Sequence, residues 1–208
     1  MKPILNITGF WVAVLIGAWI YASSDIQQPP GVLTPSDPDQ VEILPRSWTR
    51  GEAKFTALAQ FMVRARVLST NHYSFDRQAD LSPVDFALGW GRMSDSDVLA
   101  DMHISQSGRF YFWRSRYGRM LPIPKSEIIS HSANMHLIPA NEDVKSTLLD
   151  VRTGEIVTFS GFLVQVNKPK GWVWRSSLTR TDTGNGACEI VWVERLSHTD
   201  KVLTRASR

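Results

Sequence analysis

FTALAQFMVRARV, residues 55–67, is the stretch that most clearly predicts the fold. Its odd-numbered positions, from Phe55 to Val67, are all apolar, whereas the even-numbered positions include Thr, Gln and two Arg. A period of two is typical of a long strand with one buried face. A helix is the alternative, because several of the same apolar residues also align at helical spacing. The alternation favours the strand.

The carboxy-terminal third of the chain predicts further strands. They cover residues 155–166, with Gly161 as a bulge, then residues 172–175 and 188–196. Turns at residues 167–171 and 183–186, rich in Gly and Asn, separate them. Residues 41–44 could be a short docking strand.

Three short helices are expected between the strands. Ser82 and Pro83 are a helix-start signature for residues 83–88, and residues 94–97 open a second helix. Asn141 can cap a third helix over residues 142–151, which Gly154 would end. The expected class is therefore α+β, a β-rich barrel or half-barrel with two or three short helices, preceded by a transmembrane helix.

The transmembrane helix is expected from residues 4–22, ILNITGFWVAVLIGAWIYA, which carry no charge. At the rise of an α-helix this segment is about 28 Å long, close to the hydrocarbon thickness of a bilayer. Lys2 precedes it, and no Lys or Arg follows until Arg46. Positive charge stays on the cytoplasmic side, so we expect the N-terminus inside and the bulk of the chain in the periplasm.

The domain organisation follows from this anchor. Residues 1–24 are interpreted as a signal anchor, with a signal peptide cleaved after Ala22 as the alternative. Residues 25–47 contain five prolines and are expected to be a linker. Residues 48–198 would form the exported domain, and residues 199–208 a polar tail.

Composition excludes some functions. The chain has 208 residues and a net charge of +3, too balanced for a polyanion partner, so we expect no nucleic acid. Its single cysteine, Cys188, rules out an internal disulfide. No cofactor is expected.

Three residues could support thiol chemistry: His131, Cys188 and Arg195. A thiolate needs a nearby base or cation, and an arginine can stabilise an oxyanion. The order His, Cys, Arg, with Leu149 and residues 154–156 entering a strand, resembles the sortase family of cysteine transpeptidases. The resemblance implies a catalytic role for these three residues. The sequence departs from the family because Cys188 follows a turn and begins a strand.

A second resemblance covers the whole exported region. The stretches GWGRMSD (89–95), HSANMH (131–136) and RTDTG (180–184) are similar to those of a group of N-terminally anchored proteins of Gram-negative bacteria. This resemblance implies a bacterial source and no particular activity.

The two histidines of HSANMH could bind a metal, but their spacing argues against it. On a strand, residues five apart point to opposite faces, and a helix would need a spacing of four. A third ligand, such as His103, Asp101 or Asp182, would also be required. We therefore expect no metal site.

The run 109–119 is rich in arginine and aromatic side chains, which stack on sugars or contact phosphates. It suggests a binding surface formed by Arg109, Tyr111, Trp113, Arg114, Arg116 and Trp90. The alternative is a structural strand with Phe110 and Phe112 on its buried face.

The sequence thus favours a membrane-anchored periplasmic module that binds a protein or another partner in the cell envelope and has no catalytic motif. The alternative is a cysteine-dependent hydrolase or transpeptidase that uses Cys188, His131 and Arg195. The distance between Cys188 and His131 discriminates between the two, because catalysis needs a ring nitrogen of His131 close to the thiol in a cleft.

Overall fold

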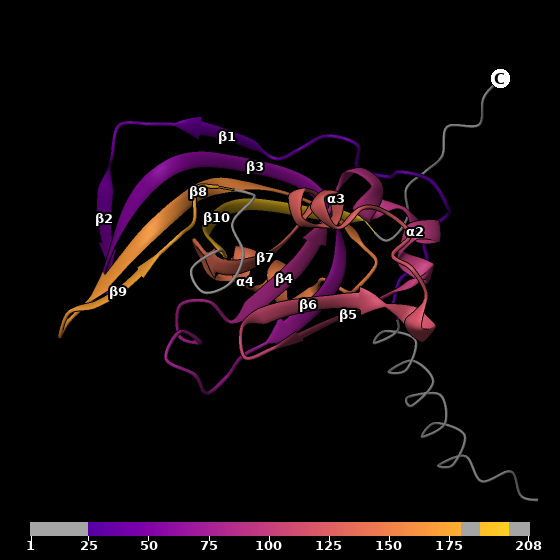
Figure 1. The fold of residues 1–208 in the computed structure, drawn as a ribbon. Helices are drawn as coiled ribbons and strands as arrows, with labels where there is room; N and C mark the ends of the chain where they lie inside the picture. The colour runs from indigo at the N-terminus through magenta and orange to yellow at the C-terminus, as the bar shows by residue number, and fades with distance from the viewer. Residues whose placement is uncertain (1–24, 180–187, 200–208) are drawn as a thin grey trace, which may run out of the picture.

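The computed structural model of the chain describes residues 25–179 and 188–199 (Figure 1). The expected anchor and nearly all of the expected tail lie outside these residues. Within the described ranges, no helix is both long and apolar enough to cross a membrane. The β-rich α+β class is confirmed, since the described residues form ten strands and three α-helices.

The elements follow one another along the chain as follows. The strands are β1 (Asp39–Glu42), β2 (Ser47–Arg50), β3 (Ala53–His72), β4 (Val84–Gly89), β5 (Met102–Ser107), β6 (Phe110–Ser115), β7 (Ser132–Pro139), β8 (Ile156–Lys168), β9 (Trp172–Arg175) and β10 (Glu189–Thr199). The α-helices are α2 (Ser96–Ala100), α3 (Lys125–Ser130) and α4 (Glu142–Asp150). Short 3-10 helices cover Gly91–Ser94 and Arg116–Gly118.

Five of the strands pair in a closed circuit. The order is β3–β4–β7–β10–β8, and β8 pairs back with β3. Every pair is antiparallel except β7 and β10, which are parallel, and α4 lies between β7 and β8 in the chain. This is the connectivity of the OB-fold, a five-stranded barrel. The chain adds a β5–β6 hairpin between the second and third barrel strands.

The long strand β3 confirms the alternation seen in the sequence. Its odd-numbered residues from Ala53 to Val67 are buried. A bulge between Ala57 and Ala59 bends it along β8. Before the bulge Phe55 packs in an aromatic cluster, and after it Phe61 packs in the cluster that fills the barrel. One strand therefore serves two cores.

The interior of the barrel is closed by α4. Asn141 caps this helix as expected, since its side chain accepts a hydrogen bond from the backbone N–H of Val144. Val144 and Leu148 face inward and join the central cluster with residues of the barrel strands, such as Phe86.

The β5–β6 hairpin and the helices α2 and α3 form an outer layer beside β4 (Figure 1). They share a third hydrophobic cluster, in which Ala87 of β4 meets Met102 of β5 and Ile128 of α3. The outer face of β4 is therefore covered by protein.

The prediction of a helix at residues 83–88 is wrong, and the outer layer over β4 explains why. The segment is strand β4, and all six of its residues are buried. Val84, Phe86 and Leu88 point into the barrel, while Asp85 and Ala87 lie under the outer layer. A strand buried on both faces lacks the alternation of polar and apolar residues that identifies a strand in a sequence. The clearest local signal was therefore Ser82-Pro83, which is typical of a helix start.

Much of the segment expected to be a linker packs on the barrel. The backbone N–H of Ile26 donates to the carbonyl of Thr153, Thr34 is buried, and β1 pairs with β3.

Gly154 does not end a helix, because α4 stops at Asp150. Its left-handed backbone passes against the carbonyl of Ile26. The domain boundaries themselves stay predictions.

The bulge expected at Gly161 of β8 lies instead on the neighbouring strand β10. The register of β10 against β8 shifts between Val193 and Arg195, directly across from Gly161. A Cβ at Gly161 would lie 1.8 Å from the Trp192 carbonyl oxygen, so the close approach of the two backbones requires glycine.

We expect Gly161→Ala to lower the free energy of unfolding by about 3 kcal/mol or more, because backbone must move to admit the methyl group. Urea unfolding of the full-length chain in detergent measures it. Ser160→Ala, at the neighbouring position, is the control and should change stability by less than about 1 kcal/mol. Equal effects of the two substitutions would contradict the close approach.

Candidate functional site

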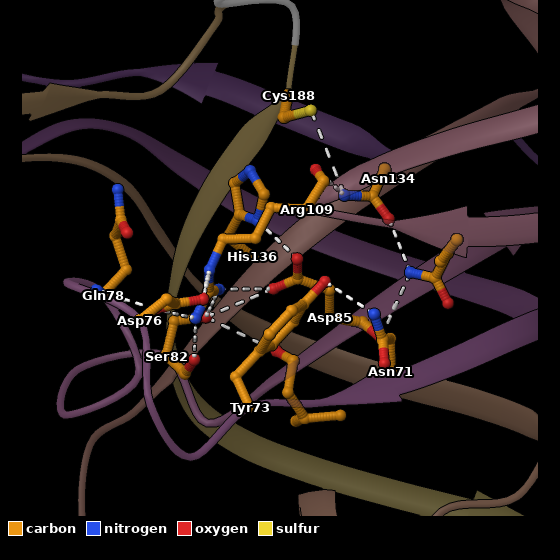
Figure 2. Close-up of polar contacts among 12 residues, drawn as sticks. Asn71, Tyr73, Asp76, Gln78, Ser82, Asp85, Arg109, Asn134, His136 and Cys188 are labelled. Atoms are coloured by element: carbon orange, nitrogen blue, oxygen red, sulfur yellow. Dashed lines mark hydrogen bonds and ion pairs between the residues drawn. The ribbon is translucent and has the colours of Figure 1, made fainter.

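Arg109, at the tip of the β5–β6 hairpin, enters a partly buried cluster of charged side chains (Figure 2). Its Nε and Nη2 donate to the two carboxylate oxygens of Asp76 at 2.7 and 2.9 Å. Its Nη1 donates to Oδ1 of Asp85 at 3.0 Å, and its Nη2 to the carbonyl of Ser82 at 2.9 Å. The Tyr73 ring centroid lies 3.8 Å from the guanidinium carbon. The arginine thus joins the hairpin, the 73–83 loop and β4.

The backbone of the hairpin turn aims this side chain. Gly108 and Arg109 have φ angles of +56° and +68°. Two consecutive residues with positive φ make the tight turn that matches the twist of a hairpin. The conformation costs about 1–2 kcal/mol for a residue other than glycine, and the hydrogen bonds of the guanidinium offset that cost.

Asp85 also contacts His136. The two residues lie directly opposite each other on β4 and β7, and Asp85 Oδ2 is 2.8 Å from His136 Nδ1. Asp85 is fully buried and His136 is 5 % exposed. Neither atom makes a hydrogen bond of normal angle to any described residue, and the close contact places the Asp85 carboxyl group beside Nδ1 of the ring.

A cavity of about 630 Å³ opens beside this cluster. Five segments of the described residues line it: the 73–83 loop, the hairpin tip, β7, β9 and the start of β10. The polar and aromatic groups on its wall include Asp76, Arg109, His136, Trp174, Arg175 and Cys188. Segments far apart in the sequence therefore build one site.

Cys188 lies on the wall of this cavity and not in the apolar core. It is partly exposed, and its Sγ is 4.0 Å from Nδ2 of Asn134. Asn134 is held in turn, because its Nδ2 donates to the Arg109 carbonyl and its Oδ1 accepts from Gln106. The thiol therefore faces polar groups that the hairpin positions.

The electrostatics of the cluster favour an ionised Asp76 and a neutral Tyr73. Burial tends to raise the pKa of Asp76, but hydrogen bonds from Arg109 and from the backbone of Gln78 and Ala79 outweigh it, and the pKa falls below its ordinary value. Burial, together with the neighbouring Asp85 carboxylate, raises the pKa of Tyr73 to about 12.

The structure does not bring His131, Cys188 and Arg195 together around one cavity. His131 ends α3, where its Nδ1 lies 2.9 Å from Ser130 Oγ and 3.0 Å from the Glu127 carbonyl. Arg195 is exposed on β10 and lines a different pocket. Among the described residues, the imidazole that shares the cavity of Cys188 is His136, and the arginines are Arg109 and Arg175.

The residues expected to form a basic and aromatic binding surface are also separated. Arg109 is buried, Trp90 is buried with its Nε1 donating to Asp37, and Tyr111 donates to Ser132. Arg114 and Arg116 remain exposed. As a group, these side chains form no single surface patch, and Arg109 alone reaches the cavity.

The expectation that Phe110 and Phe112 are buried is wrong. They are 42 % and 52 % exposed, because Tyr111 and Trp113 take the inner face of β6 and pack beside the third hydrophobic cluster. The sequence does not indicate which face of β6 is buried, because Tyr and Trp occur on both inner and outer faces of strands.

Sequence reasoning missed the pairing of Asp85 with His136. One signal was present: Asp85 is the only charged residue among the apolar residues 84–88, and a buried carboxylate needs a partner. Its partners, Arg109 and His136, are distant in the sequence. In residues 25–179 and 188–199, no three His, Cys, Asp or Glu side chains are placed so that they could hold a metal ion together.

The chain matches no family model, no curated protein and no solved structure. Its site must therefore be understood from its own geometry.

We expect Arg109→Gln to lower the free energy of unfolding by about 3–5 kcal/mol, because it leaves the buried Asp85 carboxylate without its guanidinium. Chemical denaturation of the full-length chain in detergent measures this loss. Arg114→Gln removes an exposed arginine from the same hairpin and should change stability by less than about 0.5 kcal/mol. Similar losses for both variants would argue against Arg109 as a clamp that holds the hairpin, the 73–83 loop and β4 together.

Asp76 should make stability sensitive to acid. A carboxylate whose pKa is lower in the folded state stabilises the protein above its ordinary pKa, and this stabilisation disappears as the pH falls through the folded value. We therefore expect the midpoint temperature of thermal unfolding to fall when the pH is lowered below about 4. Asp76→Asn should make this fall smaller. Asp80→Asn, an exposed carboxylate of the same loop, is the control. An unchanged pH profile in Asp76→Asn would refute the assignment.

Proposed function

We propose that this chain is a single-pass inner-membrane protein whose β-rich domain lies in the periplasm and binds a component of the cell envelope. The uncharged residues 4–22, preceded by Lys2, support an anchor with a cytoplasmic N-terminus. The cavity between the 73–83 loop and β9 would be the binding site.

The position of the cavity is the observation that carries the proposal. In OB-folds, the loops between strands one and two and between strands four and five flank the ligand site. Here these are the 73–83 loop and the segment that contains β9, and both line the cavity.

The charges on the cavity wall favour a ligand with little net charge. Two carboxyl groups, Asp76 and Asp85, contact Arg109, so together they offset the positive charges of Arg109 and Arg175. Trp174 and the exposed Val173 add apolar surface. A glycan or peptide portion of the envelope offers both polar groups and an apolar face, whereas nucleic acid would call for a basic wall.

A photo-crosslinking amino acid in place of Val173 tests this binding in intact cells. We expect a covalent adduct with an envelope component, and we expect Trp174→Ala to reduce it strongly because the indole forms part of the wall. Val41, a strand valine on β1 with 57 % exposure against 54 % for Val173, is the matched control position.

Equal adducts from both positions, or an adduct insensitive to Trp174→Ala, would refute a specific site. Alkaline phosphatase fused to the C-terminus tests the location separately, because that enzyme needs an oxidising compartment. An inactive fusion would refute the periplasmic placement.

A further inference from the structure

We propose that Cys188, His136 and Asp85 act in this cavity as a thiol nucleophile, a base and a positioning carboxylate that together transfer an acyl group. The inference rests on the proposed function, since the ligand bound in the cavity would supply the reacting carbonyl. It places the base at His136, where the order of residues in the sequence had suggested His131.

The parallel pairing of β7 and β10 puts the thiol and the imidazole on the same face. Cys188 comes directly before β10, and its Sγ lies 4.0 Å from Nδ2 of Asn134. Asn134 precedes His136 by two residues on β7, so the thiol lies on the face of the sheet that carries His136. Diagonal neighbours of this kind have Cα atoms about 7–8 Å apart, within reach of longer side chains. Both residues line the same cavity.

Asp85 decides which nitrogen of His136 is available. Its carboxylate lies 2.8 Å from Nδ1, which leaves Nε2 as the atom that can exchange a proton with the thiol. Figure 2 shows Cys188 and Asp85 on opposite sides of the imidazole. Nucleophile, base and orienting carboxylate in this order are the arrangement that activates a weak nucleophile.

Other charged and titratable groups surround the pair from each neighbouring element. They are Arg109 from the hairpin, Asp76 and Tyr73 from the 73–83 loop, Arg175 from β9 and Glu189 from β10. Arg109 donates to Asp85 and so fixes the position of this side chain beside the imidazole. It is a positioning residue, because it acts on His136 through Asp85.

The reaction balances without an oxidant or a reductant. The Cys188 thiol gives its proton to His136 Nε2, and the sulfur attacks the carbonyl carbon of an amide or ester. The C–N or C–O bond breaks, His136 returns the proton to the leaving amine or alcohol, and a thioester remains on Cys188. Water then attacks this thioester while His136 accepts a proton, which passes to the departing sulfur. A carboxylic acid is released and the thiol is restored.

The single cysteine makes the test unambiguous, because any thiol label reports on Cys188 alone. We expect iodoacetamide to alkylate the folded full-length chain at pH 7 about tenfold faster than the same chain unfolded in guanidinium. We expect p-nitrophenyl acetate to release p-nitrophenolate with one acetyl group on Cys188, detected by mass spectrometry and then lost by hydrolysis.

His136→Gln should slow alkylation at pH 7 by about tenfold and abolish acetylation, whereas His131→Gln should leave both unchanged. Circular dichroism verifies that each variant is folded. Should His136→Gln not fold, the comparison of the folded and unfolded wild-type chain still decides the question.

A folded chain that alkylates no faster than the unfolded chain would overturn the proposal, as would acetylation that persists in a folded His136→Gln variant. Fast alkylation without acetyl transfer would overturn it as well. Cys188→Ser should lose acetylation but keep the Val173 adduct, so a failure of acyl transfer and a failure of ligand binding are told apart.

Discussion

The buried guanidinium of Arg109 is the interaction on which the rest of the site depends. It brings the tip of the β5–β6 hairpin, the 73–83 loop and β4 together through two carboxylates, Asp76 and Asp85. A buried carboxylate such as Asp85 is costly to leave uncompensated, so the three segments are stable only when they are assembled. The strained turn at Gly108 and Arg109 persists because this assembly holds it.

The clamp has consequences for chemistry. With Arg109 on one of its oxygens, Asp85 presents the other oxygen to His136, and the imidazole is fixed on the outer face of β7. The hairpin that delivers Arg109 also covers the outer face of β4 and holds Asn134 near Cys188. The cavity lies beside the tip of the hairpin, where the hairpin does not cover the sheet. The Cys188 thiol and the His136 imidazole lie on its wall.

Local patterns in the sequence predict local structure well. The alternation of residues 55–67 predicts β3, and Asn141 with its acidic neighbours predicts α4, because periodicity and capping are properties of neighbouring residues. The segment 83–88 is misread because β4 owes its conformation to neighbours on both faces. Phe110 and Phe112 face outward for a similar reason, since the choice of inner face depends on α3 and β4.

The site is harder to predict because its members meet only through the topology. Sequence order suggests His131 as the partner of Cys188, and only the register of β7 against β10 selects His136. Arg109 is visible as a candidate ligand-binding residue, yet its role is internal, because Asp76 and Asp85 already occupy its donors. Charge and residue type indicate that such groups need partners, and the fold decides which partners they have.

Native-state hydrogen exchange of the full-length chain, with and without Arg109→Gln, tests this account most directly. In the wild-type chain we expect the amides of β5 and β6 to open with the same free energy as those of β4 and β7, because the clamp makes them one cooperative unit. In Arg109→Gln the hairpin amides should open separately and at lower free energy. A hairpin that already exchanges independently in the wild-type chain would contradict the central role of the clamp.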